Sequence, residues 1–378
     1  MNRFQTCLVF TMLVAVTALS DASSAAPIYN INPLTLPGPD SESIGIGISS
    51  SGVYTTGWQK ETNAELGFIR TQAGGTIELP ALDTESHPYQ TPSAVNNNGV
   101  VVGTALESEI SVTGLPVIWE DVGSVAQLPV PAGFGSGNVY AINDSGLAVG
   151  RSGKGTDPLL RATTFTTTEA IILPQTTPDG VLLSSAYDIN NGGQIVGEAN
   201  SSDDGSLARA FSLTPGSQYA TDLGTLPGHE SATAYGVSEN GYVVGRSTTA
   251  GGTRTPFIWS VTSGMVEIPK INQESGTAVA VNSDGWVTGD LTGISSVPFL
   301  YDGNATHLLN DLIPTDSGWN LAEGYGNTAR DISEDGTITG QGNYHGKRTG
   351  FVMTLVPEPN LTVLLFGALS SCLWIRRR

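Results

Sequence analysis

A short motif that recurs seven times along the chain constrains its fold more than any other feature. Each copy begins with a short side chain, a Val or Ile, and an Asn or Ser. After two variable residues come a glycine, a run rich in β-branched residues and a closing glycine, as in AVNNNGVVVG at 94–103. The first glycines, spaced by 47, 47, 47, 48, 44 and 51 residues, are Gly52, Gly99, Gly146, Gly193, Gly241, Gly285 and Gly336. So steady a period predicts a repeat architecture.

Each repeat unit contains four strand signals. The first strand ends at the Asn or Ser and turns through the first glycine, which supplies a positive φ, while the Asn or Ser can bond its own turn backbone. The second is the β-branched run, whose closing glycine indicates close approach of a neighbouring backbone. The third carries an aromatic residue, and the fourth leads into Leu-Pro or Ile-Pro. With 47 glycines, 21 prolines and 13% charged residues, the pattern predicts an all-β protein.

The seventh unit lacks its fourth strand, and the start of the chain supplies a replacement. YNINPLTLPG (29–38) shares five of ten residues with YATDLGTLPG (219–228) from the middle of the chain. We therefore predict a seven-bladed β-propeller over residues 26–356, with about 47 residues per blade and the N-terminal strand completing the last blade. Closure of this kind removes open sheet edges. An open solenoid is the alternative, but it has no use for a displaced strand.

Residues 1–25 have the pattern of a secretory signal peptide. Arg3 supplies a positive charge, Cys7–Leu19 is apolar, and Ser23-Ser24-Ala25 provides small residues at a plausible cleavage site. This pattern predicts export through the Sec machinery. The alternative is a buried N-terminal helix.

The C-terminal region predicts a membrane anchor. An apolar run at 361–375 precedes three arginines. Fifteen helical residues reach about 22 Å, which is short of a hydrocarbon core of about 30 Å, so the run is a marginal transmembrane helix. The arginines should stay on the cytoplasmic side, which leaves the upstream chain outside the cell.

This tail, residues 357–378, resembles the PEP-CTERM sorting signal of Gram-negative bacteria. The matching residues, besides the apolar run, are Pro357, Glu358, Pro359, Arg376, Arg377 and Arg378. The resemblance implies recognition by an exosortase, cleavage near the motif, and delivery to the cell surface or an extracellular exopolysaccharide matrix. A plain C-terminal anchor is the alternative, and the sequence leaves open whether the anchor is removed.

The repeats also resemble the HAF extracellular repeat family. The matching segments are LGTLPG (223–228), AYGVS (234–238) and RAF (209–211), the last in place of the family's His-Ala-Phe. No copy contains a literal His-Ala-Phe. The resemblance covers nearly all of residues 28–355 and implies no particular reaction.

Charge and cysteine content exclude several classes of function. Setting aside Arg3, Asp21, Glu358 and the three tail arginines leaves 12 basic and 33 acidic residues in 26–356, a net charge of −21. Such a field repels nucleic acid and anionic lipid. The two cysteines, Cys7 and Cys372, both lie outside this segment. Residues 26–356 therefore have no disulfide, thiol nucleophile or zinc–thiolate site.

Four Glu-Ser pairs provide a candidate binding rim. Each pair precedes the first strand of a unit, and first strands line the channel of a propeller, so the glutamates are expected around one channel mouth. There they would bind a cation such as calcium, or glycan hydroxyls; the alternative is ordinary solvated acid. These residues are Glu42, Glu85, Glu230 and Glu274.

The aromatic residues fall into two groups. Trp119, Trp259 and Tyr301 share one slot in the third strand, which predicts packing between blades. Trp286 and Trp319 lie outside that slot and are candidates for exposed stacking on sugars.

No catalytic residue, metal ligand or cofactor is predicted. Turns such as NDSG (143–146) and SEDG (333–336) have too few oxygen ligands for calcium loops and are expected to be hairpin turns. The leading hypothesis is a non-catalytic structural or adhesive protein that contacts exopolysaccharide or another surface protein. The alternative is a polysaccharide lyase or hydrolase with its site over the channel.

Overall fold

The computed structural model describes residues 26–36, 41–71, 74–109, 111, 114–154, 157–200, 207–293, 295–322 and 326–357. The predicted signal peptide (1–25), the membrane segment (361–375) and the sorting residues from Glu358 onward lie outside these ranges. Within them, no helix is both long and apolar enough to cross a bilayer.

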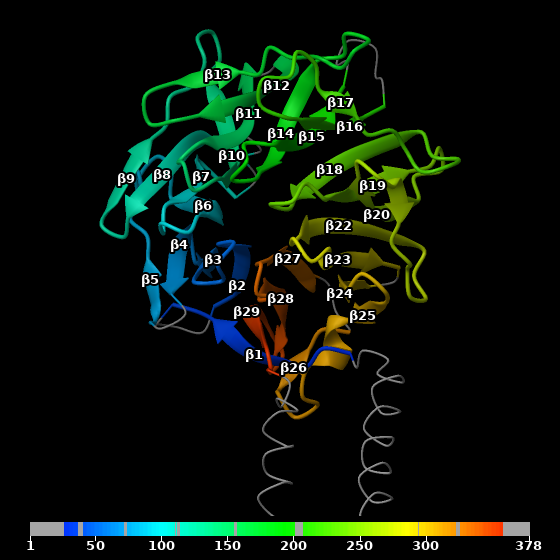
Figure 1. The fold of residues 1–378 in the computed structure, drawn as a ribbon. Helices are drawn as coiled ribbons and strands as arrows, with labels where there is room; N and C mark the ends of the chain where they lie inside the picture. Colours follow the sequence, from blue (N-terminus) through cyan, green and yellow to red (C-terminus); the bar gives the residue numbers. More distant parts are fainter. Residues whose placement is uncertain are drawn as a thin grey trace, which may run out of the picture.

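Apart from the short strand β26 (Trp319–Asn320), the described strands group into seven units of four antiparallel strands (Figure 1). A single parallel bridge, between Glu65 and Tyr89, joins the first two units into one eight-stranded sheet. The first contains β2 (Ser43–Ile48), β3 (Tyr54–Glu61), β4 (Ala64–Thr71) and β5 (Thr76–Glu78); the second β6 (Tyr89–Val95), β7 (Val101–Leu106), β8 (Leu115–Asp121) and β9 (Ser124–Gln127); the third β10 (Ser136–Ile142), β11 (Ala148–Lys154), β12 (Asp157–Phe165) and β13 (Ala170–Ile172); the fourth β14 (Leu183–Ile189), β15 (Ile195–Ala199), β16 (Arg209–Leu213) and β17 (Thr221–Asp222). The fifth contains β18 (Ser231–Val237), β19 (Val243–Thr248), β20 (Arg254–Ser260) and β21 (Gly264–Glu267); the sixth β22 (Ser275–Val281), β23 (Val287–Thr292), β24 (Ser296–Tyr301) and β25 (Thr306–Leu308); the seventh β27 (Thr328–Ile332), β28 (Ile338–Tyr344), β29 (Lys347–Leu355) and β1 (Tyr29–Leu34).

The units follow one another around a closed ring. Each first strand contacts the first strand of the next unit, and β27 of the last unit contacts β2 of the first. Figure 1 shows the units in chain order, with the blue β1 beside the red β29. The chain is thus all-β, with sheets arranged as in a propeller.

The N-terminal strand completes the last unit, as predicted. β1 pairs antiparallel with β29, from Tyr29 opposite Leu355 to Leu34 opposite Gly350. Tyr29 and Leu34 are fully buried, so this strand contributes to the core as well as to the sheet. Pro33, which has no N–H to donate, is tolerated because β1 is the outer strand of its sheet.

Both glycines of the motif are explained by backbone geometry. The seven turn glycines have φ between 74° and 90°, a region that other residues rarely adopt. At the closing glycine of the β-branched run, an added Cβ would overlap a carbonyl oxygen of the unit's own first strand, as at Gly245 against Thr233. The predicted close backbone approach is confirmed.

The motif's asparagines join neighbouring units. Asn143 accepts hydrogen bonds from the N–H groups of Ser145 and Leu147 in its own turn. Its amide nitrogen donates to the carbonyl of Asn190 in the next unit, 47 residues on. Equivalent bonds run from Asn96, Asn190 and Asn282. The acidic turns are therefore hairpin turns, as predicted, and they also link unit to unit.

The core lies between the sheets. In five units, a fully buried phenylalanine of the third strand stands opposite the closing glycine of the second. These residues are Phe68, Phe211, Phe257, Phe299 and Phe351. Trp119 is also fully buried, and its indole N–H donates to the carbonyl of Pro80 at 2.8 Å. Packing between units, predicted for the aromatic slot, is confirmed for this tryptophan.

The connection between the sixth and seventh units contains two short elements. The 3₁₀ helix η1 (Leu309–Leu312) is followed by β26 (Trp319–Asn320), which pairs with the end of β28. Leu309 and Leu321 are fully buried in the cluster that surrounds Phe351. This connection therefore covers part of the core of the last unit.

Candidate functional site

A cavity of about 110 Å³ lies at one end of the ring, where the first strands end in their hairpin turns. All seven units contribute to its wall. The lining residues at the motif's first two positions are mainly Ile48, Ala94, Ala141, Asp188, Val237, Ala280 and Asp331. This turn-side cavity is therefore the mouth of the central channel.

Asp188 and Asp331 occupy the motif's first slot, where the other five copies have Gly or Ala. Oδ2 of Asp188 accepts the N–H of Val237 in the next unit, and Oδ2 of Asp331 accepts that of Ile48, each at 2.8 Å. Each Oδ1 also accepts the N–H of the following residue. The two carboxyls therefore bridge adjacent units at the channel wall.

The same two carboxyls have raised pKa values. Enclosure by the ring removes them from bulk water and raises the pKa of Asp188 to about 6 and that of Asp331 to about 7, although the side chains stay half-buried where they face the cavity. The negative charge of Asp188 raises the pKa of Asp331 further. These carboxyls were not predicted from the sequence, although two acids in a slot otherwise filled by Gly or Ala were the available signal.

A row of three tyrosines lies one residue before this slot, on adjacent units. Tyr140 and Tyr187 have ring centroids 5.4 Å apart, and Tyr187 and Tyr235 are 5.2 Å apart. The register of each first strand shifts at its tyrosine, so each residue occupies a β-bulge. All three side chains are half-buried. We call this set the tyrosine row.

Charged groups flank the tyrosine row. The guanidinium of Arg151 lies 5.7 Å from the ring centre of Tyr140, and that of Arg246 lies 5.4 Å from Tyr235. Burial, followed by the negative charge of Glu198, raises the pKa of Tyr187. The row therefore combines aromatic surface with two cations and one carboxylate.

Two buried polar atoms beside the row lack hydrogen-bond partners among the described residues. They are Nε of Arg151 and Oδ1 of Asn138, which stand opposite each other on β11 and β10. Most buried polar atoms in proteins are hydrogen-bonded, so an unpaired donor and acceptor together indicate capacity for a polar ligand or water.

The four predicted rim glutamates are all exposed and precede the first strands, at the end of the ring opposite the turn-side cavity. Glu42 lies 3.7 Å from Nη1 of Arg348, and Glu85 belongs to a turn in which its N–H donates to Asp83. Across the described ranges, no three His, Cys, Asp or Glu side chains are grouped to hold a metal ion. Glu230 and Glu274 are likewise not brought together with the others.

The prediction of exposed stacking by Trp286 and Trp319 is wrong for Trp319 and unsupported for Trp286. Trp319 is 8% exposed, stacks on Tyr344 at 4.7 Å and meets Phe351 edge-on at 5.9 Å. Trp286 is half-buried and packs against the same cluster. Position outside the aromatic slot did not mean exposure, because the connection between the last two units folds back over the core.

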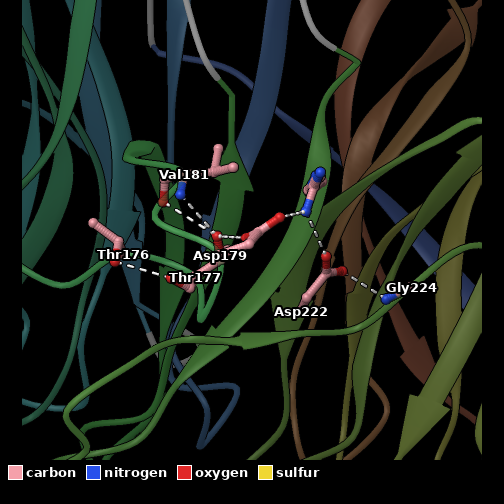
Figure 2. Close-up of polar contacts among 7 residues, drawn as sticks. Thr176, Thr177, Asp179, Val181, Asp222 and Gly224 are labelled. Carbon is pink, nitrogen blue, oxygen red and sulfur yellow. Dashed lines mark hydrogen bonds and ion pairs between the residues drawn. The ribbon is translucent and has the colours of Figure 1, made fainter.

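Arg209, predicted to replace the histidine of the HAF repeat, forms two ion pairs at the surface. Its Nη1 lies 2.6 Å from Asp179 and 3.4 Å from Asp222. Figure 2 shows Asp179 receiving the Thr177 hydroxyl and Asp222 receiving the Gly224 N–H. Exposed ion pairs of this kind contribute little free energy. These ion pairs attach the loop before β14 to β17, and they do not resemble a catalytic arrangement.

Comparison with known proteins identifies the fold. Residues 117–212, about a quarter of the chain, match the family described as protein of unknown function, DUF3466. No curated protein matches the chain. Among solved structures, an oligogalacturonate lyase from Vibrio parahaemolyticus has a TM-score of 0.56 and 10% identity, covering 88% of this chain and 99% of its own.

Two further structures support the same architecture. The β-propeller domain of the Trilobed protease from Pyrococcus furiosus has a TM-score of 0.53 and 11% identity, covering 84% of this chain and 97% of its own. YCF48 bound to D1 peptide has a TM-score of 0.50 and 13% identity, covering 89% and 96%. At such identities the likeness establishes an all-β propeller fold and no activity.

Proposed function

We propose that this chain is an exported seven-bladed β-propeller that binds polysaccharide at the cell surface or in the extracellular matrix without altering it chemically. The tyrosine row is the observation that carries this proposal. Aromatic rings with polar ends suit sugars, which present apolar ring faces and hydroxyl edges. Tyr140, Tyr187 and Tyr235 supply aromatic surface, and the guanidinium groups of Arg151 and Arg246 lie beside it.

Overall charge supports a glycan ligand over the alternatives. The whole chain has a net charge of −19, so nucleic acid and anionic lipid are repelled. Arg151 and Arg246 remain as local cations at the two ends of the tyrosine row. A neutral or weakly acidic polysaccharide is consistent with both observations.

Export and sorting rest on the two ends of the sequence. The proposal assigns residues 1–25 to Sec-dependent export and residues 357–378 to recognition by an exosortase, with at least transient membrane anchoring. The test is cell fractionation with mass spectrometry of the mature termini. A mature start near Ala26 supports the proposal, and recovery of the full chain from the cytoplasm refutes it.

Titration calorimetry tests the binding function. The full chain, purified in mild detergent, is titrated with the exopolysaccharide of the producing organism, once with calcium and once with a chelator. Calcium-independent heat that Tyr187→Ala weakens at least about tenfold supports the tyrosine row. The control is Tyr219→Ala, since Tyr219 is a 48% exposed tyrosine remote from the row. Heat seen only with calcium would direct attention to the four glutamates, and no heat would refute glycan binding.

A carbohydrate-active enzyme is the second candidate. The observation that favours it is Asp188 and Asp331, two carboxyls in one cavity with pKa values raised toward neutrality. The cavity of about 110 Å³ is, however, well below the usual range of about 300–1,000 Å³ for ligand pockets. Incubation with polysaccharide, followed by ultraviolet absorbance of unsaturated sugars and assay of new reducing ends, distinguishes the candidates. Turnover lost in Asp331→Asn would establish the enzyme.

A further inference from the structure

A second pocket, of about 310 Å³, lies at the seam where the ring closes. One wall comes from β1 and β29 of the last unit and the other from β3 and β4 of the first, with the two neighbouring hairpin turns at its edge. We call it the seam pocket. Its lining residues are Asn32, Gly52, Val53, Thr55, Arg70, Thr71, Thr337, Val352 and Thr354. Its volume is at the lower end of the range for small-molecule sites.

Arg70 is the one charged residue among the described residues of this lining. It lies on β4 opposite Thr55, and its side chain is half-buried. Its guanidinium has no hydrogen bond or ion pair with any residue that the structure describes. Burial alone lowers its pKa, with no nearby carboxylate to oppose the effect.

Several other cations among the described residues have acidic or aromatic partners. Arg209 pairs with Asp179, Lys60 with Glu109, and Arg348 with Glu42, whereas Arg246 lies over the ring of Tyr235. An enclosed cation without a counter-charge is unfavourable in a protein unless a partner compensates it. In a chain with 35 acidic and 16 basic residues, Arg70 has no carboxylate partner among the described residues.

The rest of the pocket supplies uncharged hydrogen-bonding groups. The side chains of Thr55, Thr71, Thr354 and Asn32 form no hydrogen bond with another described residue. Asp335 lies beside Gly52 at the edge of the pocket, and its Oδ1 accepts the hydroxyl of Ser333 and the N–H of Thr337 in its own turn. The described lining itself therefore presents one positive charge among hydroxyl and amide groups.

We propose that the seam pocket binds a carboxylate-bearing sugar. Arg70 forms an ion pair with the carboxylate, and the threonine and asparagine side chains form hydrogen bonds with the sugar hydroxyls. A guanidinium fork matches a carboxylate in two parallel hydrogen bonds. The abundance of hydroxyl partners favours a sugar acid over a peptide carboxylate. This site is separate from the tyrosine row and does not depend on glycan binding there.

The position of the pocket adds a second consequence. A ligand held between β1 and β4 contacts both sides of the closure, so it binds only when the N-terminal strand is in place. By linkage, such a ligand stabilises the folded state. The melting temperature is therefore expected to rise with the concentration of the sugar acid.

The test uses the full chain in mild detergent and three monomeric probes: glucuronate, glucose and acetate. Binding is measured by titration calorimetry and by thermal melting. We expect glucuronate to bind and to raise the melting temperature, and glucose and acetate each to bind at least about tenfold more weakly. Arg70→Gln should reduce glucuronate affinity at least about tenfold, whereas Arg254→Gln, at an exposed arginine of β20, should leave it unchanged.

Three outcomes would overturn the proposal. They are equal binding of glucuronate and glucose, equal binding of acetate and glucuronate, and retention of glucuronate affinity in Arg70→Gln. Asn32→Ala is the second variant, because Asn32 is exposed on an outer strand and its truncation should leave folding intact. It should weaken glucuronate severalfold and acetate hardly at all. Tyr187→Ala should not affect either probe, which separates failure of this site from failure of the tyrosine row.

Discussion

The hydroxyl of Tyr29 donates a hydrogen bond of 3.0 Å to the carbonyl of Gly336, a residue 307 positions away in the chain. Tyr29 begins the N-terminal strand, and Gly336 is the turn glycine of the last unit. This bond and the pairing of β1 with β29 hold the ring closed. The first strand of the described chain is therefore part of its last sheet.

Loss of the closing bond should lower stability measurably. Tyr29→Phe keeps the ring but leaves the Gly336 carbonyl without this donor, at a cost of about 1 kcal/mol, and Tyr29→Ala should cost about 3–5 kcal/mol because the ring is fully buried. Denaturant unfolding measures both. Tyr219→Phe is the control, and an effect of Tyr29→Ala no larger than that control would contradict the role given to β1.

A methyl group at a closing glycine should not be tolerated. In Gly245→Ala the new Cβ would overlap the carbonyl oxygen of Thr233 and lie 2.9 Å from the ring of Phe257. We expect a loss of at least about 2 kcal/mol in the free energy of unfolding. Gly75→Ala, where nothing lies within 4 Å of the added carbon, should change stability by less than about 0.5 kcal/mol. Equal losses of stability in the two variants would show that steric exclusion of a side chain does not explain the glycine at position 245.

The asparagine hydrogen bonds between units should contribute as much to the free energy of unfolding as ordinary core contacts. Asn190 is buried, donates to the carbonyl of Ser238 in the next unit at 2.9 Å, and accepts the N–H of Gln194 in its own turn. Asn190→Ala leaves both backbone groups without these partners, and we expect a cost of about 2 kcal/mol. Thermal or denaturant unfolding checks this, with Asn63→Ala on the exposed β3–β4 turn as the neutral reference.

Stability should depend on pH through Asp188 and Asp331. Their pKa values rise from 3.8 in the unfolded reference to about 6 and about 7 in the fold. Between about pH 4 and pH 7 the folded state therefore holds more protons than the unfolded state, and these two groups lower stability as pH rises through that window. Protonation on acidification relieves the penalty.

Denaturant unfolding between pH 5 and pH 7.5 tests this sign. The double variant Asp188→Asn with Asp331→Asn should lose relatively less stability than the parent as pH rises, because its side chains do not titrate. Asp316→Asn, at an exposed loop position, should follow the parent. A double variant whose pH profile runs parallel to that of the parent would rule out a contribution from the pair.

Several features of the fold were predictable because their causes are local. A turn glycine such as Gly146 is required by its own φ, and Asn143 bonds the turn in which it lies. Both requirements act within a few residues, so they repeat visibly in the sequence. The displaced strand was also recognisable, since YNINPLTLPG matches a fourth-strand segment and the last unit lacks one.

The candidate sites were not predictable in the same way. Tyr140, Tyr187 and Tyr235 line up because a bulge in each first strand places them side by side on adjacent units. The three tyrosines do recur at one repeat position, but the pattern does not show that the bulge brings their rings within 5.4 Å of one another. The four glutamates recur just as regularly, yet they are separated around the ring.

By itself, the sequence determined the all-β repeat, the turns that delimit its strands, and the closure by β1, because turn geometry and strand pattern are short-range properties. Only the tertiary structure decided that Trp319 is buried, that Asp188 and Asp331 share one cavity, and that Arg70 at the seam has no partner among the described residues. Each of these depends on which surfaces meet when the ring closes, and residues far apart in the chain come together only then.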